Sequence, residues 1–227
     1  MTDSEKDTLN RTADSGRRLD KIDSLIDHFD RALRTLHPGI TKARRSNPSA
    51  DLDESEMSAE ERRHAAGLMR VNHTGEVCAQ ALYSGQSLTA RSDDARQAML
   101  ESAQEEEDHL AWCEQRLEEL DAKTSILNPL FYAGSFAMGA LAGLSGDKFS
   151  LGFIEATEDR VCQHLRDHLQ KLPAADKRSR AIVAKMIEDE TIHGEKALQK
   201  GGRVFTEAQK NAMAELSKVM TSSTYRI

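Results

Sequence analysis

Three stretches of the chain place a glutamate three residues before a histidine, and two of them, Glu106 with His109 and Glu190 with His193, lie on helix faces with apolar neighbours. Because residues three apart share one face of an α-helix, each pair presents a carboxylate beside an imidazole. Apolar residues recur on the same two faces, so both pairs are expected to face a core. Burying a carboxylate costs on the order of several kcal/mol unless a cation lies beside it. The chain must therefore fold so that these helices bring compensating groups together.

Two other helical segments each carry one glutamate among apolar neighbours, Glu76 and Glu158. Thirty residues separate Glu76 from Glu106, and 32 residues separate Glu158 from Glu190. The chain thus reads as two copies of one pattern, a helix with Glu followed by a helix with Glu-x-x-His. A bundle that turns all four helices inward would gather four carboxylates and two imidazoles.

Helical periodicity extends over most of the chain, and no segment alternates with period two for long enough to predict a strand. Aromatic residues make up only 4% of the chain, which also favours an all-α class. Ser58 is the expected N-cap of the first core helix. We expect core helices over about 58–90, 92–121, 147–172 and 174–199, with a short last helix over about 206–220. These four long helices predict a four-helix bundle.

The bundle is expected to occupy residues 58–227 and to follow a separate start, residues 1–57. Residues 1–16 are polar and expected to be disordered, and an amphipathic helix should run from about Leu19 to just before Pro38. Residues 38–58 have the composition of a linker. The first residues do not have the pattern of a secretory signal, and the 3 cysteines form no CxxC pair. An intracellular, reducing location is therefore expected.

The uncharged segment Thr124–Gly146 lies between the second and third core helices. Three interpretations are open: a connection packed on the bundle, an apolar surface that enters one leaflet of a membrane, or a transmembrane span. Its several glycines argue against one uniform spanning helix. In the interfacial interpretation, Phe131 and Phe136 are expected to contact lipid. The net charge of −7 argues against nucleic acid as a partner.

Four carboxylates carry a charge that two divalent cations would neutralise. Carboxylate and imidazole ligands suit iron or manganese, and ligand preference alone does not decide between them. This arrangement is the one found in ferritin-like di-iron carboxylate bundles. The alternative is a purely structural network of buried ion pairs.

The stretch LMRVNHTGE at residues 68–76, followed by AQALYSGQ at 79–86, resembles a known family. The chain is similar there to the bacterial demethoxyubiquinone (demethoxyubiquinol) hydroxylases of ubiquinone biosynthesis. Matching stretches recur at 105–109, 146–159 and 189–193, and the resemblance covers roughly residues 17–227. Carried over by position, it implies two iron ions, Fe2+ or Fe3+ with the redox state, and six ligands: Glu76, Glu106, His109, Glu158, Glu190 and His193.

The resemblance implies an O2-dependent di-iron monooxygenase that hydroxylates the ring of a polyprenyl-methoxy-methyl-benzoquinol. This is a late step of ubiquinone biosynthesis. Its partners would be the polyprenyl quinol, O2 and an electron donor. Because the substrate resides in a bilayer, we expect a peripheral protein on the cytoplasmic side of the plasma membrane. A homo-oligomer or association with other quinone-biosynthesis proteins would be compatible with this role.

No catalytic residue separate from the metal ligands is expected. Asp189 could orient a ligating histidine or be a solvated helix charge, and Tyr83 could hydrogen-bond near the metals or only fill the core. His164 could relay a proton or an electron, or simply be packed. His73 and Asn72 could shape the entrance of the site without ligating. Three other functions remain alternatives: a di-iron tRNA hydroxylase, a ferritin-like iron store, and a non-catalytic quinone-binding subunit.

Overall fold

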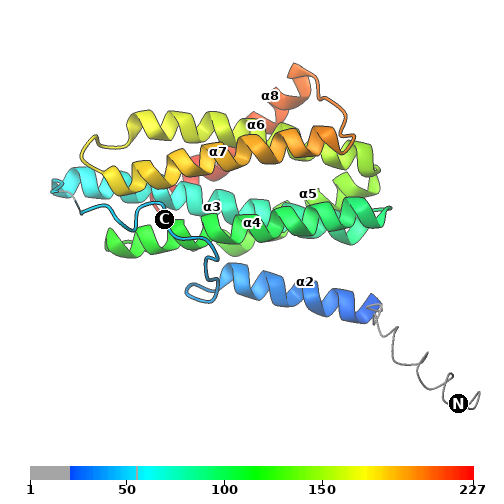
Figure 1. Ribbon diagram of the computed structural model, residues 1–227, viewed down its shortest axis with the longest axis horizontal. Coiled ribbons are helices and arrows are strands. Elements are labelled where there is room, and N and C mark those ends of the chain that lie inside the picture. The colour runs from blue at the N-terminus through cyan, green and yellow to red at the C-terminus, as the bar shows by residue number, and fades with distance from the viewer. Residues whose placement is uncertain (1–20, 55) are drawn as a thin grey trace, which may run out of the picture. The chain divides into compact units, whose positions relative to one another are not determined.

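The computed structural model describes residues 21–54 and 56–227, and every regular element in those ranges is a helix (Figure 1). The all-α class is confirmed. The expected disordered start at residues 1–16, and Leu19, lie outside the described residues. The helices are α2 (Lys21–Leu36), α3 (Ala59–Thr89), α4 (Asp93–Glu119), α5 (Asn128–Leu144), α6 (Asp147–Lys171), α7 (Lys177–Gln199) and α8 (Glu207–Thr224).

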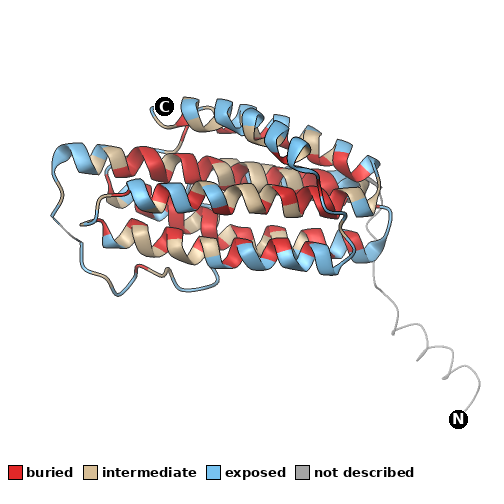
Figure 2. Cartoon of the chain, turned by 90° about the horizontal axis from the view of Figure 1, so that it is seen from above, coloured by how far each residue is buried: buried red, intermediate tan, exposed pale blue. Residues whose placement is uncertain are grey.

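Two compact units divide the chain, Met1–Arg31 and Ala32–Ile227. The second unit contains the bundle, in which α3 packs beside α4 and α6 packs beside α7. Contacts between α3 and α6 and between α4 and α7 join the two pairs. Buried residues line the facing sides of these helices (Figure 2). The four helices predicted from periodicity are therefore the four that form the core.

Local signals in the sequence determine where the helices begin. The hydroxyl of Ser58 accepts a hydrogen bond from the backbone N–H of Glu61, whose side chain accepts one from the N–H of Ser58. This reciprocal capping satisfies two of the N–H groups that every helix start leaves without a partner. Ser92 caps α4 in the same position relative to its helix. The predicted N-cap at Ser58 is confirmed.

The bundle core has two apolar clusters with a polar layer between them. One cluster is built around Met69, Trp112 and Met186, and the other around Tyr83 and Met99. Each of the four long helices contributes to both clusters, and its glutamate lies between the two contributions along the chain. The glutamates of all four helices are thus held at one level by apolar packing on either side.

Most of the segment Thr124–Gly146 forms the helix α5, which packs along α3. Glycines allow the close approach, because a Cβ on Gly139 would clash with the carbonyl oxygen of Leu82. Phe136 is partly buried against the cluster around Val77, and the expectation that it contacts lipid stays a prediction. The opposite face of α5 is exposed and apolar, with Leu130, Leu141 and Leu144 each at least 60% accessible. The segment therefore combines features of two interpretations, packed connection and apolar surface.

Within residues 21–54 and 56–227, none of the helices has the length and apolar character that crossing a membrane requires.

Candidate metal centre

The polar layer of the bundle contains all six residues that the sequence singled out. Each is at most 3% accessible to solvent: Glu76 on α3, Glu106 and His109 on α4, Glu158 on α6, and Glu190 and His193 on α7. Helical periodicity alone places each Glu-x-x-His pair on one face, and the packing of the four helices brings those faces together. We call these six residues the candidate metal centre.

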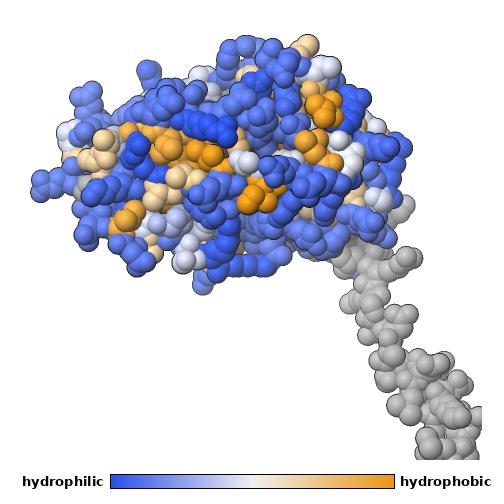
Figure 3. Space-filling model, turned by 45° about the horizontal axis from the view of Figure 1, so that its top comes forward, coloured by the Kyte–Doolittle hydropathy of each residue, from blue (hydrophilic) through white to orange (hydrophobic). Residues whose placement is uncertain are grey.

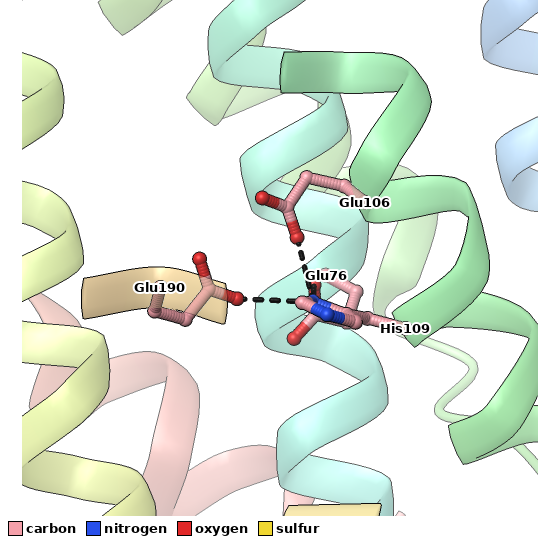
Figure 4. A group of neighbouring side chains, drawn as sticks. All are labelled: Glu76, Glu106, His109 and Glu190. Atoms are coloured by element: carbon pink, nitrogen blue, oxygen red, sulfur yellow. Dashed lines mark hydrogen bonds and ion pairs between the residues drawn. The ribbon is translucent and has the colours of Figure 1, made fainter. Parts of the chain in front are cut away.

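His109 lies at the middle of one half of this centre (Figure 4). Its Nδ1 is 2.9 Å from Glu106 Oε2, 3.1 Å from Glu190 Oε1 and 3.8 Å from Glu76 Oε2. One potential ligand atom from each of these four residues lies within 4.8 Å of the others. A single cation could therefore contact three carboxylates and one imidazole there.

His193 occupies the corresponding position in the other half. Its Nδ1 is 2.7 Å from Glu106 Oε1 and 3.0 Å from Glu190 Oε2. Glu106 and Glu190 thus each direct one carboxylate oxygen to His109 and the other to His193. Glu158 lies close enough for its charge to act on Glu106 and Glu190, and its Oε1 accepts a hydrogen bond from the hydroxyl of Tyr83 at 2.5 Å. Tyr83 therefore makes the contact that a supporting role requires.

Burial and the charges of neighbouring groups shift the pKa values of several residues of the centre. Burial, and then the neighbouring charge of Glu106, hold the pKa of Glu76 well above its usual value. Burial, and then Glu190 and Glu106, do the same to the pKa of Glu158. Burial alone would lower the pKa of His193, but the charge of Glu106 raises it to about 12. Such shifts are expected where a divalent cation belongs among the ligands.

The outer nitrogen of each central histidine meets a carboxylate from the opposite helix. His109 Nε2 lies 2.9 Å from Asp189 Oδ2, and His193 Nε2 lies 2.6 Å from Glu105 Oε2. If these nitrogens carry the ring protons, both Nδ1 lone pairs point into the centre. Of the two interpretations open for Asp189, this contact is the one that orients a ligating histidine, whereas Glu105 is not among the residues that the sequence singles out. The internal repeat could have identified it, since both residues directly precede the glutamate of a Glu-x-x-His pair.

The remaining candidates contact residues other than the six. The rings of His164 and His168 have centroids 3.9 Å apart, and His168 Nδ1 lies 2.7 Å from the Oδ1 of Asn72. His73 is buried at the contact with α5, where its Nδ1 is 3.4 Å from Asn128 Nδ2. Burial lowers the pKa of His73 to about 4, so this imidazole is neutral near pH 7.

An apolar cavity of about 360 Å³ adjoins the centre between α3, α5, α6 and α8. Glu76 and Gly75 line it on the side of the bundle, together with Val161 of α6. Leu130 of α5 and Val219 of α8 line it as well, and both are more than 60% exposed at the surface. The cavity thus extends from exposed apolar side chains to a carboxylate of the candidate metal centre.

The donor set fits hard or borderline divalent cations. Four buried carboxylates and two imidazoles provide oxygen and nitrogen ligands without thiolate, a combination that suits iron or manganese. The raised pKa values of Glu76 and Glu158 indicate the positive charge that such ions would supply. In a purely structural ion-pair network, protons held by Glu76, Glu158 and the two histidines would have to compensate this charge instead.

Comparison with known proteins points to one family. The family model described as ubiquinone biosynthesis protein COQ7 matches residues 63–224. Similar curated proteins, each named 3-demethoxyubiquinol 3-hydroxylase, come from Chromohalobacter salexigens, Stutzerimonas stutzeri and Acinetobacter baumannii. The Chromohalobacter protein is 56% identical over 93% of this chain and 99% of its own length. The Stutzerimonas protein is 55% identical over 94% of this chain and 99% of its own length. The Acinetobacter protein is 55% identical over 90% of this chain and 96% of its own length.

Proposed function

The chain belongs to the family of the ubiquinone biosynthesis protein COQ7, and on that premise we propose that it is a 3-demethoxyubiquinol 3-hydroxylase. The reaction replaces a ring C–H of the quinol by C–OH. It consumes one O2, two electrons and two protons, and the second oxygen atom leaves as water. The observation that carries the proposal is the buried set of four carboxylates and two imidazoles beside an apolar cavity.

We propose that Glu76, Glu106, His109, Glu158, Glu190 and His193 hold two iron ions. Glu106 and Glu190 would contribute to both halves of the centre, because each directs one carboxylate oxygen to His109 and the other to His193. When bound, the iron pair supplies the redox chemistry that activates O2. The surrounding apolar clusters keep water away from the centre, while Asp189 and Glu105 fix the rings of His109 and His193.

The apolar cavity is the proposed site of the quinol ring. Its lining is mostly apolar, and Glu76 places the metal centre at its inner side. A prenyl tail attached to the ring would follow the apolar walls towards the exposed residues Leu130 and Val219. This arrangement lets the ring reach the centre while the tail stays in an apolar environment.

Changing Gly75 to leucine should block the cavity without disturbing the fold. A Cβ at Gly75 would meet no atom within 4 Å, and a non-glycine residue favours the helix by about 1 kcal/mol. We expect kcat/KM for the quinol to fall at least about tenfold because the side chain competes with the ring. Gly75→Ala is the matched control. Unchanged kinetics in the leucine variant, with normal metal content and melting temperature, would exclude this cavity as the ring site.

We further propose that the exposed face of α5 docks the protein on the cytoplasmic side of the plasma membrane. Leu141 and Leu144 expose 65% and 60% of their surface there. Figure 3 shows one face of the molecule, on which apolar side chains gather in groups among hydrophilic ones. Exposed apolar side chains such as Leu141 and Leu144 are typical of surfaces that enter a membrane interface.

The double variant Leu141→Asp with Leu144→Asp should bind lipid vesicles at least about tenfold more weakly than the wild type. Each leucine side chain that the membrane buries contributes about 1.5–3 kcal/mol to binding. Co-sedimentation with vesicles measures this partition. Val204→Asp is the control, since Val204 is 73% exposed but lies outside α5. Equal partition of the double variant and the wild type would show that α5 does not dock the protein.

The function itself is tested by the quinone profile of a cell that lacks this protein. We expect the demethoxy quinone to accumulate and to be converted again when the wild-type gene is returned. A normal ubiquinone profile in the deletion strain, with no other hydroxylase for this step in the genome, would contradict the proposed activity.

A further inference from the structure

A segment between α2 and α3 runs along the outside of α4 and α7. We call residues 39–54 the strap. The backbone N–H of Gly39 donates to Glu114 Oε1 at 2.9 Å, and near the other end Glu54 accepts from both terminal nitrogens of Arg116 at 2.7 and 3.1 Å. The strap has the linker composition predicted from the sequence, but it is tied to the bundle at both ends.

Arg45, in the middle of the strap, connects two acidic residues on different helices. Its Nε donates to Asp108 Oδ2 on α4 at 2.5 Å, and its Nη1 donates to Asp189 Oδ2 on α7 at 2.7 Å. The guanidinium group also lies 5.0 Å from the ring centroid of Trp112. The side chain is 41% accessible, whereas Asp108 and Asp189 are 5% and 9% accessible, so the arginine covers two nearly buried carboxylates.

The oxygen of Asp189 that accepts from Arg45 is the same one that faces His109 Nε2. The other carboxylate oxygen lies 3.1 Å from Lys185 Nζ. Asp189 is therefore held at both oxygens, and its carboxylate plane cannot turn without losing a charged hydrogen bond. Since His109 is fully buried, its outer nitrogen has a partner only while Asp189 keeps this orientation.

The corresponding contact in the other half of the centre is more open. Glu105, the partner of His193, is 44% accessible and pairs with Lys196, which is 48% accessible. The strap thus reinforces only the half that contains His109. Arg45 also lies outside residues 63–224, the span of the family match, whereas the bacterial relatives align over more than 90% of the chain.

We propose that Arg45 is a positioning residue for the metal centre. It fixes Asp189, which holds the ring of His109 with Nδ1 directed at Glu76, Glu106 and Glu190. The inference rests on the proposed metal centre and adds to it a residue from outside the bundle. Removing the guanidinium leaves Asp189 free to turn towards Lys185, and the His109 ring loses its outer anchor.

Titration of the metal-free full-length protein with Co2+ tests this, because Co2+ absorption reports both affinity and ligand geometry. We expect Arg45→Ala to weaken one of two Co2+ sites by about 10- to 100-fold and to change its ligand-field spectrum. Arg45→Lys should restore part of the affinity, since a single ammonium cannot bridge both carboxylates as the planar guanidinium does. Arg44→Ala is the matched control, because the Arg44 side chain is 64% accessible and makes only a long ion pair, 4.0 Å from its Nη2 to Glu107 Oε2.

A second control separates positioning from anchoring of the strap. Arg178 donates to the carbonyl of Leu52 at 2.8 Å, so Arg178→Ala loosens the strap without touching Asp189. It should lower the melting temperature but leave the Co2+ spectrum unchanged. A double-mutant cycle with Asp189→Asn completes the test, and non-additive losses of affinity are expected if Arg45 acts through Asp189. If Arg45→Ala does not fold, Arg45→Gln takes its place in the cycle.

These results distinguish a failure of the proposed role of Arg45 from a failure of the proposed metal centre. Wild-type affinity and spectrum in the Arg45 variant, or additive losses in the cycle, would overturn the role of Arg45 and leave the metal centre intact. A wild-type protein that binds no Co2+ at the six residues would instead overturn the metal centre itself.

Discussion

Replacing Glu106 by alanine is expected to abolish quinol hydroxylation and to prevent the binding of both metal ions. Glu106 directs one oxygen to each central histidine, at 2.9 and 2.7 Å, so its loss removes a negative charge from both halves at once. The loss of metal affinity should exceed the about 10- to 100-fold loss that follows when a residue that hydrogen-bonds to a metal ligand is removed. The fold should survive, because the apolar clusters on either side of the polar layer are unchanged.

Metal content and the quinone profile of the complemented deletion strain measure this effect. Glu107→Ala is the matched control: Glu107 is the next residue on α4, and its side chain is 33% accessible. The control should bind metal and clear the demethoxy quinone as the wild type does. Stoichiometric binding of two metal ions by the Glu106 variant would contradict the assignment of Glu106 as a shared ligand.

The metal-free protein is expected to become more stable as the pH falls from about 8 towards 5. Burial and neighbouring carboxylates raise the pKa of Glu76 and Glu158 above 4.5, and surrounding carboxylates outweigh burial to raise the pKa of His109 and His193 above 6.5. A group whose pKa is higher in the folded state contributes stability in full below its unfolded value. That contribution is lost as the pH rises through the folded value. All four groups therefore favour the folded state at the lower pH.

Glu106 sets the lower end of this range. Although burial would raise its pKa, the charges of His193 and His109 hold it well below 4.5. Its contribution is present in full above pH 4.5 and is lost as the pH falls from 4.5 through its folded value, so Glu106 opposes the gain from the other groups only below about pH 4.5. The stabilisation that a bound metal adds has the opposite pH dependence and decreases as the pH falls. The ligands must be deprotonated to bind the metal, so protons compete with the cation.

Melting temperatures of the chelator-treated protein between pH 8 and pH 5, at constant ionic strength, test this dependence. The melting temperature should rise across the range without metal, whereas the increase produced by added Co2+ should shrink. Glu158→Gln is the matched variant, since it removes one of the shifted groups and should flatten the rise. A melting temperature that falls steadily from pH 8 to pH 5 in the metal-free protein would contradict the expected electrostatics.

Short-range patterns in the sequence predict most of the residues of the candidate metal centre. The Glu-x-x-His spacing and the apolar neighbours of Glu76 and Glu158 specify helix faces, because three or four residues complete one helical turn. The serine at position 58 marks a helix start for an equally local reason. The internal repeat then implied that four such faces share one core, and all six residues lie there in the structure.

Contacts between distant segments were decided only by the tertiary structure. Arg45 meets Asp189 across 144 positions of the chain, and Glu105 meets His193 across 88, so no helical period relates them. The packing of α5 on α3, which buries part of Phe136 and exposes Leu141, depends on where glycines let two backbones approach. Periodicity determines which face of a helix is apolar. The partner of each polar side chain is set by the way the helices and the strap pack, because hydrogen bonds and ion pairs require distances of a few ångströms.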